Sequence, residues 1–287
     1  MARAMTESKQ SYYETSSRDL TARLNFFPQL REAARAITLA LFQNPVPAEN
    51  KSQHDYDPVT EADIEAERVL RRLIGEKFPD DSIIGEELED ITGTNSFTWT
   101  LDPIDGTRGF IAGVPVWSTL IALSDKDQPV LGMIDLPALS KTYMGAVDNN
   151  GTPQAWLEEA GLYNQIKTAP CAQLKDAVIG CTEPLAMFNA GELAAYNIIR
   201  TGTRFSRLGL DALGYGLVAQ GRMNIIIEAD LKPCDVRALI PIIVGAGGAM
   251  TNWHGGSCVD GGQVVAVSDA ALLPELYTYL GRAMTPA

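Results

Sequence analysis

The chain has 287 residues, and its 23 Lys and Arg against 36 Asp and Glu give a formal net charge of −13. This acidic balance argues against a nucleic-acid-binding or membrane-surface protein, because both partners attract clustered basic residues. A hydrophobic content of 46% with 21% charged residues is ordinary for a globular protein and excludes a largely disordered chain. If the ligand is an anion, bound metal cations rather than net charge must hold it.

The spacing of the cysteines and the lengths of the apolar segments indicate the cellular compartment of the protein. The four cysteines share no CxxC spacing, which disfavours a zinc ribbon or a redox dithiol and suits a reduced protein. Residues 1–17 contain no apolar segment of the kind found in signal peptides. The longest apolar stretch, residues 238–250, is shorter than the about 20 residues of a membrane-spanning helix. We therefore expect a soluble, cytoplasmic protein.

Two amphipathic helices are predicted first. Pro28 marks the start of one helix, and the TEAD sequence from Thr60 resembles a capping box that opens the other. Residues 44–58 between them are rich in Pro, Asn and Asp, and are predicted to form a loop. Apolar residues recur at helical spacing in both segments. The inward faces consist of Leu30, Ala33, Ala34, Ile37 and Leu41 in the first helix, and of Ile64, Val69, Leu70, Leu73 and Ile74 in the second.

The rest of the chain divides into a strand-rich part and an alternating part. Short strands bounded by turn residues are predicted over residues 82–87, 97–102, 117–124, 129–135 and 141–147, and the DNNG turn at 148–151 closes this part. Strands at 177–182, 204–208 and 224–229 then alternate with helices at 190–200, 211–220, 235–245 and 270–283. Such alternation predicts a layered α/β fold. We expect two domains, residues 1–155 and 156–287, with the boundary between 148 and 165.

The most informative segment is WTLDPIDGT at residues 99–107. Asp102 and Asp105 lie three positions apart at the end of a predicted strand, and Pro103 fixes the turn between them. Such a turn directs both carboxylates and the Ile104 carbonyl at one point, and these oxygens are ligands that Mg²⁺ accepts. The residues that follow are predicted to start a short helix whose free N–H groups suit a phosphate. A tight acidic turn without any ligand explains this spacing alone equally well.

Five further acidic residues each have a structural explanation when taken singly. Glu86 and Glu87 can be solvated surface after a strand, and Asp63 belongs to the predicted capping box. Asp235 precedes an apolar helix as an N-cap does, and Glu228 ends a strand, where an acidic side chain is expected to be exposed. Taken together, they place acids at several strand ends and helix starts, as a metal site between two domains requires.

These segments carry a family resemblance. VTEAD (59–63), GEE (85–87), WTLDPIDGTRGF (99–110) and KPCD (232–235) resemble, in order, the signature motifs of the inositol monophosphatase-like family of Mg²⁺-dependent, lithium-sensitive phosphatases. The resemblance implies the sugar-phosphatase fold, with alternating α-β-α-β-α layers. The tracts DPIDGTRGFIAGVPVWSTLIAL and LKPCDVRALIPIIVGAGGAMTNWHG are more similar to histidinol-phosphate phosphatases of this fold than to inositol phosphatases. Cys234 departs from the pattern, because the family usually has Trp or Tyr before this aspartate.

The resemblance also implies roles for individual residues. Thr107 and Glu86 would orient the attacking water, and the amides of Gly106 and Thr107 would hold phosphate oxygens. Asp63 would assist a further Mg²⁺ or its water. The implied metal ligands are Glu86, Asp102, the carbonyl of Ile104, Asp105 and Asp235. The implied contacts to the rest of the substrate are Arg207, Asp211 and Glu228. For Arg207, a surface salt bridge is the alternative explanation.

The sequence therefore predicts a Mg²⁺-dependent phosphomonoesterase that hydrolyses L-histidinol phosphate through a metal-activated water, with no phosphoenzyme. Carboxylates at Asp211 and Glu228 suit the ammonium group of an amino alcohol better than a neutral polyol. One alternative is the same chemistry on inositol monophosphate or another small sugar phosphate. Another is a non-catalytic protein whose acidic cluster serves metal-stabilised folding or partner binding. The joint presence of Thr107 and Glu86 argues against it, because a structural metal site needs no water-positioning hydroxyl.

The chain lacks the motifs of other enzymes that act on phosphate groups. His54 and His254 fall outside the motifs, which disfavours a histidine nucleophile. The sequence contains no GxxxxGK[ST] phosphate-binding loop, which disfavours a nucleotide-driven kinase.

A homodimer is expected, both from the resemblance and because two-fold dimers are the commonest oligomers.

Overall fold

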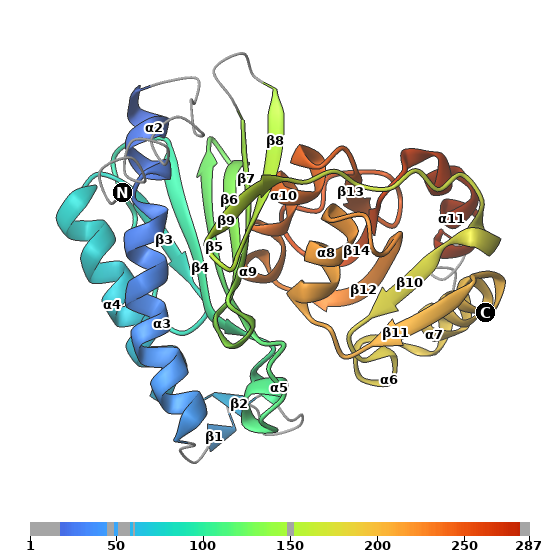
Figure 1. The fold of residues 1–287 in the computed structure, drawn as a ribbon, viewed down its shortest axis with the longest axis horizontal. Helices are drawn as coiled ribbons and strands as arrows, with labels where there is room; N and C mark the ends of the chain where they lie inside the picture. Colours follow the sequence, from blue (N-terminus) through green and yellow to red (C-terminus); the bar gives the residue numbers. More distant parts are fainter. Residues whose placement is uncertain (1–17, 45–48, 51–57, 60, 148–151, 282–287) are drawn as a thin grey trace.

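The computed structural model describes residues 18–44, 49–50, 58–59, 61–147 and 152–281. These residues form a seven-stranded sheet, a five-stranded sheet and a two-stranded ribbon. Helices cover the outer face of each large sheet and fill the space between them (Figure 1). The predicted layer order α-β-α-β-α is confirmed. Among the described residues, no helix is both long enough and apolar enough to cross a membrane.

The first helical layer covers one face of the larger sheet. It consists of α2 (Arg18–Leu24), α3 (Phe27–Gln43) and α4 (Glu61–Lys77). Pro28 lies in the first turn of α3, as predicted, because its missing N–H has no helical partner there. Leu30 and Leu70 are fully buried and pack with Trp99 of the sheet. The two short strands β1 (Glu49–Asn50) and β2 (Pro58–Val59) pair within the predicted loop, and Thr60 lies outside the described residues.

The larger sheet has the order β3-β4-β5-β6-β7-β8-β9 and is antiparallel except for its first pair. The five predicted strands are confirmed, but β8 and β9 escaped prediction and continue the sheet beyond residue 155. The predicted domain boundary at 155 falls inside β8, and the division into two domains stays a prediction. The strands are β3 (Ser82–Gly85), β4 (Phe97–Asp105), β5 (Ser118–Asp125), β6 (Gln128–Leu136), β7 (Lys141–Val147), β8 (Pro153–Glu159) and β9 (Leu162–Gln165).

The middle layer consists of α8 (Ala212–Ala219), α9 (Pro233–Val236) and α10 (Leu239–Gly245). The single helix predicted over 235–245 is wrong, because the chain breaks after Val236 and restarts at Leu239. Pro241 then lies in the first turn of α10, where proline removes no helical hydrogen bond. Side-chain Cβ atoms at Gly132 and Gly145 would lie 2.0 Å from the Ala238 oxygen and 2.3 Å from the Pro241 carbonyl carbon. The helical backbone therefore rests directly on β6 and β7.

The smaller sheet has the order β11-β10-β12-β14-β13 and carries the outer helices α7 (Ala190–Gly202) and α11 (Leu273–Leu280). The three predicted strands and the predicted α7 are confirmed, whereas β13 and β14 escaped prediction. Short helices α5 (Thr107–Ile111) and α6 (Pro184–Met187) follow β4 and β10. The strands are β10 (Val178–Cys181), β11 (Phe205–Leu208), β12 (Ile225–Leu231), β13 (Ala249–Asn252) and β14 (Gly262–Val267).

Candidate active site

The end of β4 brings the two aspartates of the DPID turn together. The pairing of β4 with β5 shifts register between Asp102 and Asp105, so the strand bends there. The Ile104 amide donates to Asp102 Oδ1 at 3.1 Å, and Thr107 Oγ1 donates to the Ile104 carbonyl at 3.1 Å. The turn therefore gathers two carboxylates, one carbonyl and one hydroxyl, as the proline-fixed spacing predicts.

Asp235 reaches this cluster from the second half of the chain. One carboxylate oxygen from each of Asp102, Asp105 and Asp235 lies within 4.8 Å of the others. Asp235 is the third residue of α9 rather than its N-cap, so the N-cap interpretation is wrong. Its Oδ2 accepts a 2.6 Å hydrogen bond from the Lys232 amide, which fixes the carboxylate at the start of the helix.

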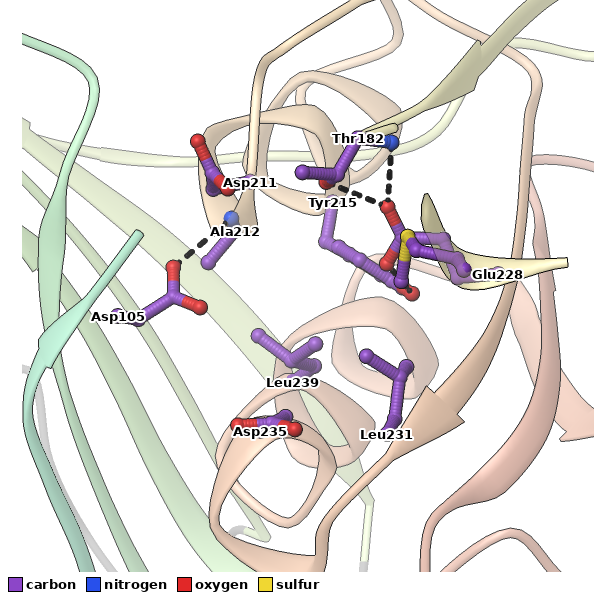
Figure 2. A pocket seen from close by; sticks show the side chains of 10 residues that line it. Asp105, Thr182, Asp211, Ala212, Tyr215, Glu228, Leu231, Asp235 and Leu239 are labelled. Atoms are coloured by element: carbon purple, nitrogen blue, oxygen red, sulfur yellow. Dashed lines mark hydrogen bonds between the residues drawn. The ribbon is translucent and has the colours of Figure 1, made fainter. Parts of the chain in front are cut away.

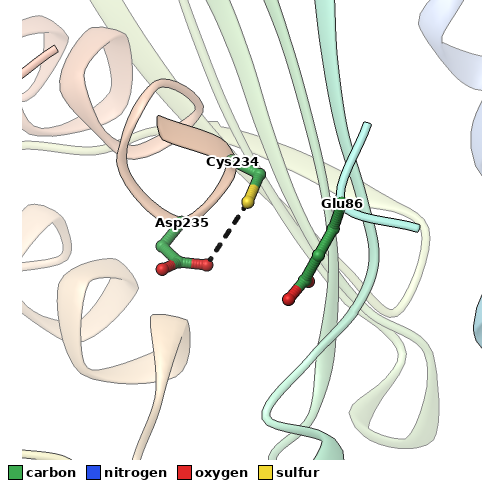
Figure 3. Close-up of side chains that lie close together, drawn as sticks. All are labelled: Glu86, Cys234 and Asp235. Atoms are coloured by element: carbon green, nitrogen blue, oxygen red, sulfur yellow. Dashed lines mark hydrogen bonds between the residues drawn. The ribbon is translucent and has the colours of Figure 1, made fainter. Parts of the chain in front are cut away.

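Glu86 approaches Asp235 from the loop after β3. The side-chain ligand atoms of Glu86, Cys234 and Asp235 lie within 4.8 Å of one another (Figure 3). Lys232 Nζ donates to Glu86 Oε1 at 2.9 Å and so joins the two halves of the chain beside the cluster. The buried Cys234 thiol, in the position of the family's aromatic ring, is 3.7 Å from Asp235 Oδ1.

The carboxylates of the cluster repel one another. Burial raises the pKa of Asp102 well above its ordinary value, and the charges of Glu86, Asp105, Asp235 and Asp63 raise it further. Asp63 is buried in the first turn of α4, and its charge is the last named of these causes. Burial likewise raises the pKa of Asp105 to about 8 and that of Asp235 to about 7. Oxygen donors this close together fit a divalent cation, whose charge offsets their repulsion.

A cavity of about 150 Å³ opens beside the cluster (Figure 2). Glu228 faces Asp105 and Asp235 across it. Thr182 donates to Glu228 Oε1 through its amide at 2.8 Å and its hydroxyl at 2.6 Å, and Tyr215 donates to Oε2 at 2.8 Å. Glu228 is only 4% exposed, so the expectation of an exposed strand-end acid is wrong: β12 is a central strand that continues to Leu231, and Glu228 lies in its middle, paired with Val264 of β14. The lining residues are Asp105, Thr182, Met187, Asp211, Ala212, Tyr215, Glu228, Leu231, Asp235 and Leu239.

Asp211 lines the same cavity as Asp105 and Glu228 (Figure 2). Burial, followed by the charge of Glu228, raises the pKa of Asp211 to about 6, while Arg108 lowers it. Its backbone has a φ of 48°, which is strained for a residue other than glycine. A Cβ on Gly106 would lie 3.0 Å from Asp211 Cγ, so the DPIDGT glycine permits this close approach.

The profile of the inositol monophosphatase family matches residues 19–284. The chain belongs to the inositol monophosphatase family. It is 39% identical over 203 residues to the bifunctional phosphatase IMPL2, chloroplastic, of Arabidopsis thaliana, a match that covers 70% of this chain and 56% of that protein. It is 32% identical over 256 residues to a histidinol-phosphatase of Chlorobaculum parvum, covering 88% and 94% of the two chains. An inositol monophosphatase structure from Zymomonas mobilis matches with a TM-score of 0.77 at 31% identity, covering 91% of this chain and 98% of that one.

Arg207 is a predicted substrate contact that lies neither in the aspartate cluster nor in the cavity lining. It lies exposed on the edge strand β11, with its guanidinium 5.5 Å above the Phe205 ring. It is not among the described residues that line the cavity. A contact from Arg207 to the substrate therefore stays a prediction.

Four residues that sequence reasoning did not single out also support the site. Ser118 donates to Asp105 Oδ2 at 2.9 Å, while Thr182 and Tyr215 hold Glu228, and Lys232 contacts Glu86. Lys232 belongs to the quoted KPCD motif, and Thr182 ends a correctly predicted strand. Ser118 and Tyr215 carry no such signal, because their partners are remote in sequence.

Proposed function

We propose that this phosphatase hydrolyses L-histidinol phosphate with Mg²⁺. The observation that carries the proposal is a single cavity with the Asp102–Asp105–Asp235 cluster at one side and the buried carboxylate of Glu228 at the other. The cluster suits the cations that bind a phosphate, and Glu228 suits an ammonium group on the same small molecule. The histidinol-phosphatase name of the Chlorobaculum relative supports this choice of substrate.

The chain's own groups define how such a substrate would be held. Glu86, Asp102, Asp105, Asp235 and the Ile104 carbonyl are the residues that would bind Mg²⁺, with Asp63 beside them. When bound, Mg²⁺ supplies the positive charge that activates a water and neutralises the phosphate.

Thr107 is the residue that would orient the attacking water together with Glu86. Its hydroxyl donates its proton to the Ile104 carbonyl, so its oxygen lone pairs remain to accept a hydrogen bond from that water. The amides of Gly106 and Thr107 are proposed to contact phosphate oxygens.

The opposite end of the cavity would select the rest of the substrate. Glu228 accepts three hydrogen bonds from Thr182 and Tyr215, and a carboxylate has about four acceptor positions. One position therefore remains for a donor on the substrate. Asp211 adds a second negative charge nearby, which favours an ammonium group over a neutral hydroxyl.

A second candidate is inositol monophosphate or another small sugar phosphate. The likeness to the Zymomonas mobilis inositol monophosphatase favours it, and hydroxyl groups can also donate to Glu228. Phosphate release from a panel of small phosphomonoesters with Mg²⁺ separates the two. We expect the highest kcat/KM on L-histidinol phosphate, and a preference for inositol monophosphate would refute that substrate while leaving the phosphatase activity intact.

Three further properties belong to the same proposal. We propose that the enzyme is inhibited by lithium, works as a homodimer and acts in the cytoplasm as part of histidine biosynthesis. Lithium titration of phosphate release and light scattering of the purified protein test the first two directly.

A further inference from the structure

The loop that carries Glu86 is held by a buried ion pair on α4. Glu67 is fully buried and Arg71 is 8% exposed, and Arg71 Nε donates to Glu67 Oε1 at 2.6 Å. Asp63, Glu67 and Arg71 are four residues apart, so they lie on one face of the helix. The same face therefore carries Asp63, whose charge raises the pKa of Asp102, and the Glu67–Arg71 pair one and two turns further along the helix.

The pair binds the backbone on the far side of Glu86. Glu67 accepts hydrogen bonds from the amides of Glu87 at 2.8 Å and Leu88 at 3.2 Å. Arg71 donates to the carbonyls of Leu88 at 2.8 Å and Glu89 at 2.7 Å. Residues 87–89 belong to no strand, and two side chains thus provide hydrogen-bond partners for four of their backbone groups. On the near side, the Glu86 amide donates to the Leu101 carbonyl of β4 at 3.2 Å.

The glycine of the GEE motif makes room for this arrangement. A Cβ on Gly85 would lie 2.0 Å from Glu67 Oε1 and 2.6 Å from an Arg71 nitrogen, distances that no side chain tolerates. Glycine lets the strand end pass over the ion pair without displacing it. The sequence pattern at residues 85–87 therefore serves two purposes, since Gly85 admits the pair that holds the next residue.

Stability alone does not account for a buried ion pair. Removing two charges from water costs about as much as their attraction returns, and apolar residues of similar volume are often as stabilising. What an apolar pair cannot do is satisfy two amides and two carbonyls of one loop. We propose that Glu67 and Arg71 are positioning residues that hold the Glu86 carboxylate in register with Asp235 and Asp63 for divalent-cation binding. This inference rests on the proposed function, in which Glu86 is a metal ligand.

The decisive experiment replaces both charges at once. The double variant Glu67→Leu/Arg71→Met leaves no buried charge unpaired, and water can reach the freed groups of the half-exposed loop. We expect its Tm to stay near that of the wild type, while the Mg²⁺ Kd from isothermal titration calorimetry rises about tenfold, as for other residues that orient metal ligands. At saturating Mg²⁺, turnover should return to the wild-type value, because the affected step is binding.

Asp81→Asn is the matched control. Asp81 is equally buried, pairs with Arg23 at 2.7 Å and anchors the opposite end of β3. We expect this variant to lose stability but to keep its Mg²⁺ Kd within twofold of the wild type. Wild-type affinity in the double variant, or a tenfold loss in the control as well, would overturn the positioning role.

Two further measurements keep the inference separate from folding and from the proposed function. Hydrogen exchange of the wild-type protein needs no substitution: the Glu87 and Leu88 amides should be protected, and fast exchange at both would overturn the inference. Glu86→Gln should weaken Mg²⁺ binding at least as much as the double variant does. If it binds as the wild type does, Glu86 is not a ligand and the inference falls with that assignment. If Glu86→Gln alone weakens binding, the metal site stands and only the positioning role is refuted.

Discussion

Replacing Asp105 by Asn should make the protein more stable and much less active. A single oxygen, Asp105 Oδ2, accepts both hydrogen bonds, from Ser118 Oγ at 2.9 Å and from the Ala212 amide at 3.1 Å. The carbonyl oxygen of Asn can take that place and keep both bonds. The variant should therefore fold, but lose on the order of 10³-fold in turnover, because a charge that binds the cation is gone.

The gain in stability follows from the pKa of Asp105. Burial and then the charge of Asp211 raise this pKa from an ordinary value of 3.8 to about 8. At about 1.4 kcal/mol per unit, keeping Asp105 ionised costs the metal-free protein up to about 5 kcal/mol at pH 8. Neighbouring carboxyls titrate with it and share that cost, so we expect about 2 kcal/mol for the substitution. In a chain of 287 residues, that corresponds to a rise in Tm of roughly 3 °C.

The pH dependence of the Asp105 contribution has a definite sign. Because the pKa of Asp105 is higher in the folded state, its contribution to wild-type stability is fully present below about pH 4 and is lost as the pH rises towards 8. The Tm difference between variant and wild type in EDTA should therefore grow from pH 5 to pH 8, and Mg²⁺ should reduce it. Thermal unfolding at both pH values and phosphate release with Mg²⁺ measure the two effects. A lower Tm for Asp105→Asn at pH 8 in EDTA, or unchanged turnover, would refute the reasoning.

Three other outcomes are expected. Excess EDTA should abolish phosphate release and added Mg²⁺ should restore it, whereas full turnover in EDTA would exclude a required cation. Glu228→Gln should lose about ten- to a hundred-fold in kcat/KM on histidinol phosphate and less on glycerol phosphate, and equal losses on both would contradict an ammonium-binding role. Both oxygens of Glu228 accept hydrogen bonds and the amide nitrogen of Gln cannot, so we also expect this variant to lose about 1 kcal/mol of stability. Cys234 should resist iodoacetamide at pH 8 in EDTA, since burial and the charge of Asp235 raise the pKa of its thiol; rapid labelling seen by mass spectrometry would show otherwise.

The site was predictable from sequence where the relevant contacts are local. Pro103 fixes the backbone between Asp102 and Asp105, so their convergence follows from a few adjacent residues. The alternation of periodic segments predicted a layered α/β fold, and the family resemblance implied the order of the layers. The expected exposure of Glu228 was wrong because sequence alone does not say that β12 lies between two other strands. Nor does it say that the strand continues past Glu228 to Leu231, beside a β14 that joins the sheet from elsewhere in the chain.

Most of the elements that escaped prediction have weak local patterns. β8, β9 and β13 have mixed polarity and show no clean alternation, whereas β14 contains the apolar run VVAV at residues 264–267, which is a strand signal in its own right. The break between α9 and α10 is signalled only by Pro241, whose tolerance depends on which helical turn it occupies. Ser118 and Tyr215 support the site through partners that only the tertiary fold brings near. Such contacts have no counterpart in residue spacing.

The contact of α10 with Gly132 and Gly145 affects how the protein can come apart. Helical backbone from the second half rests on sheet backbone from the first without a side chain between them, and the central apolar cluster contains residues of both. Pulling the halves apart would expose that whole cluster, so neither fragment of a chain cut between the sheets should keep its fold alone. Calorimetry of the intact protein should show a single transition whose calorimetric and van't Hoff enthalpies agree. Asp235, three residues before Ala238, is thereby joined to the first sheet through the backbone that rests on it.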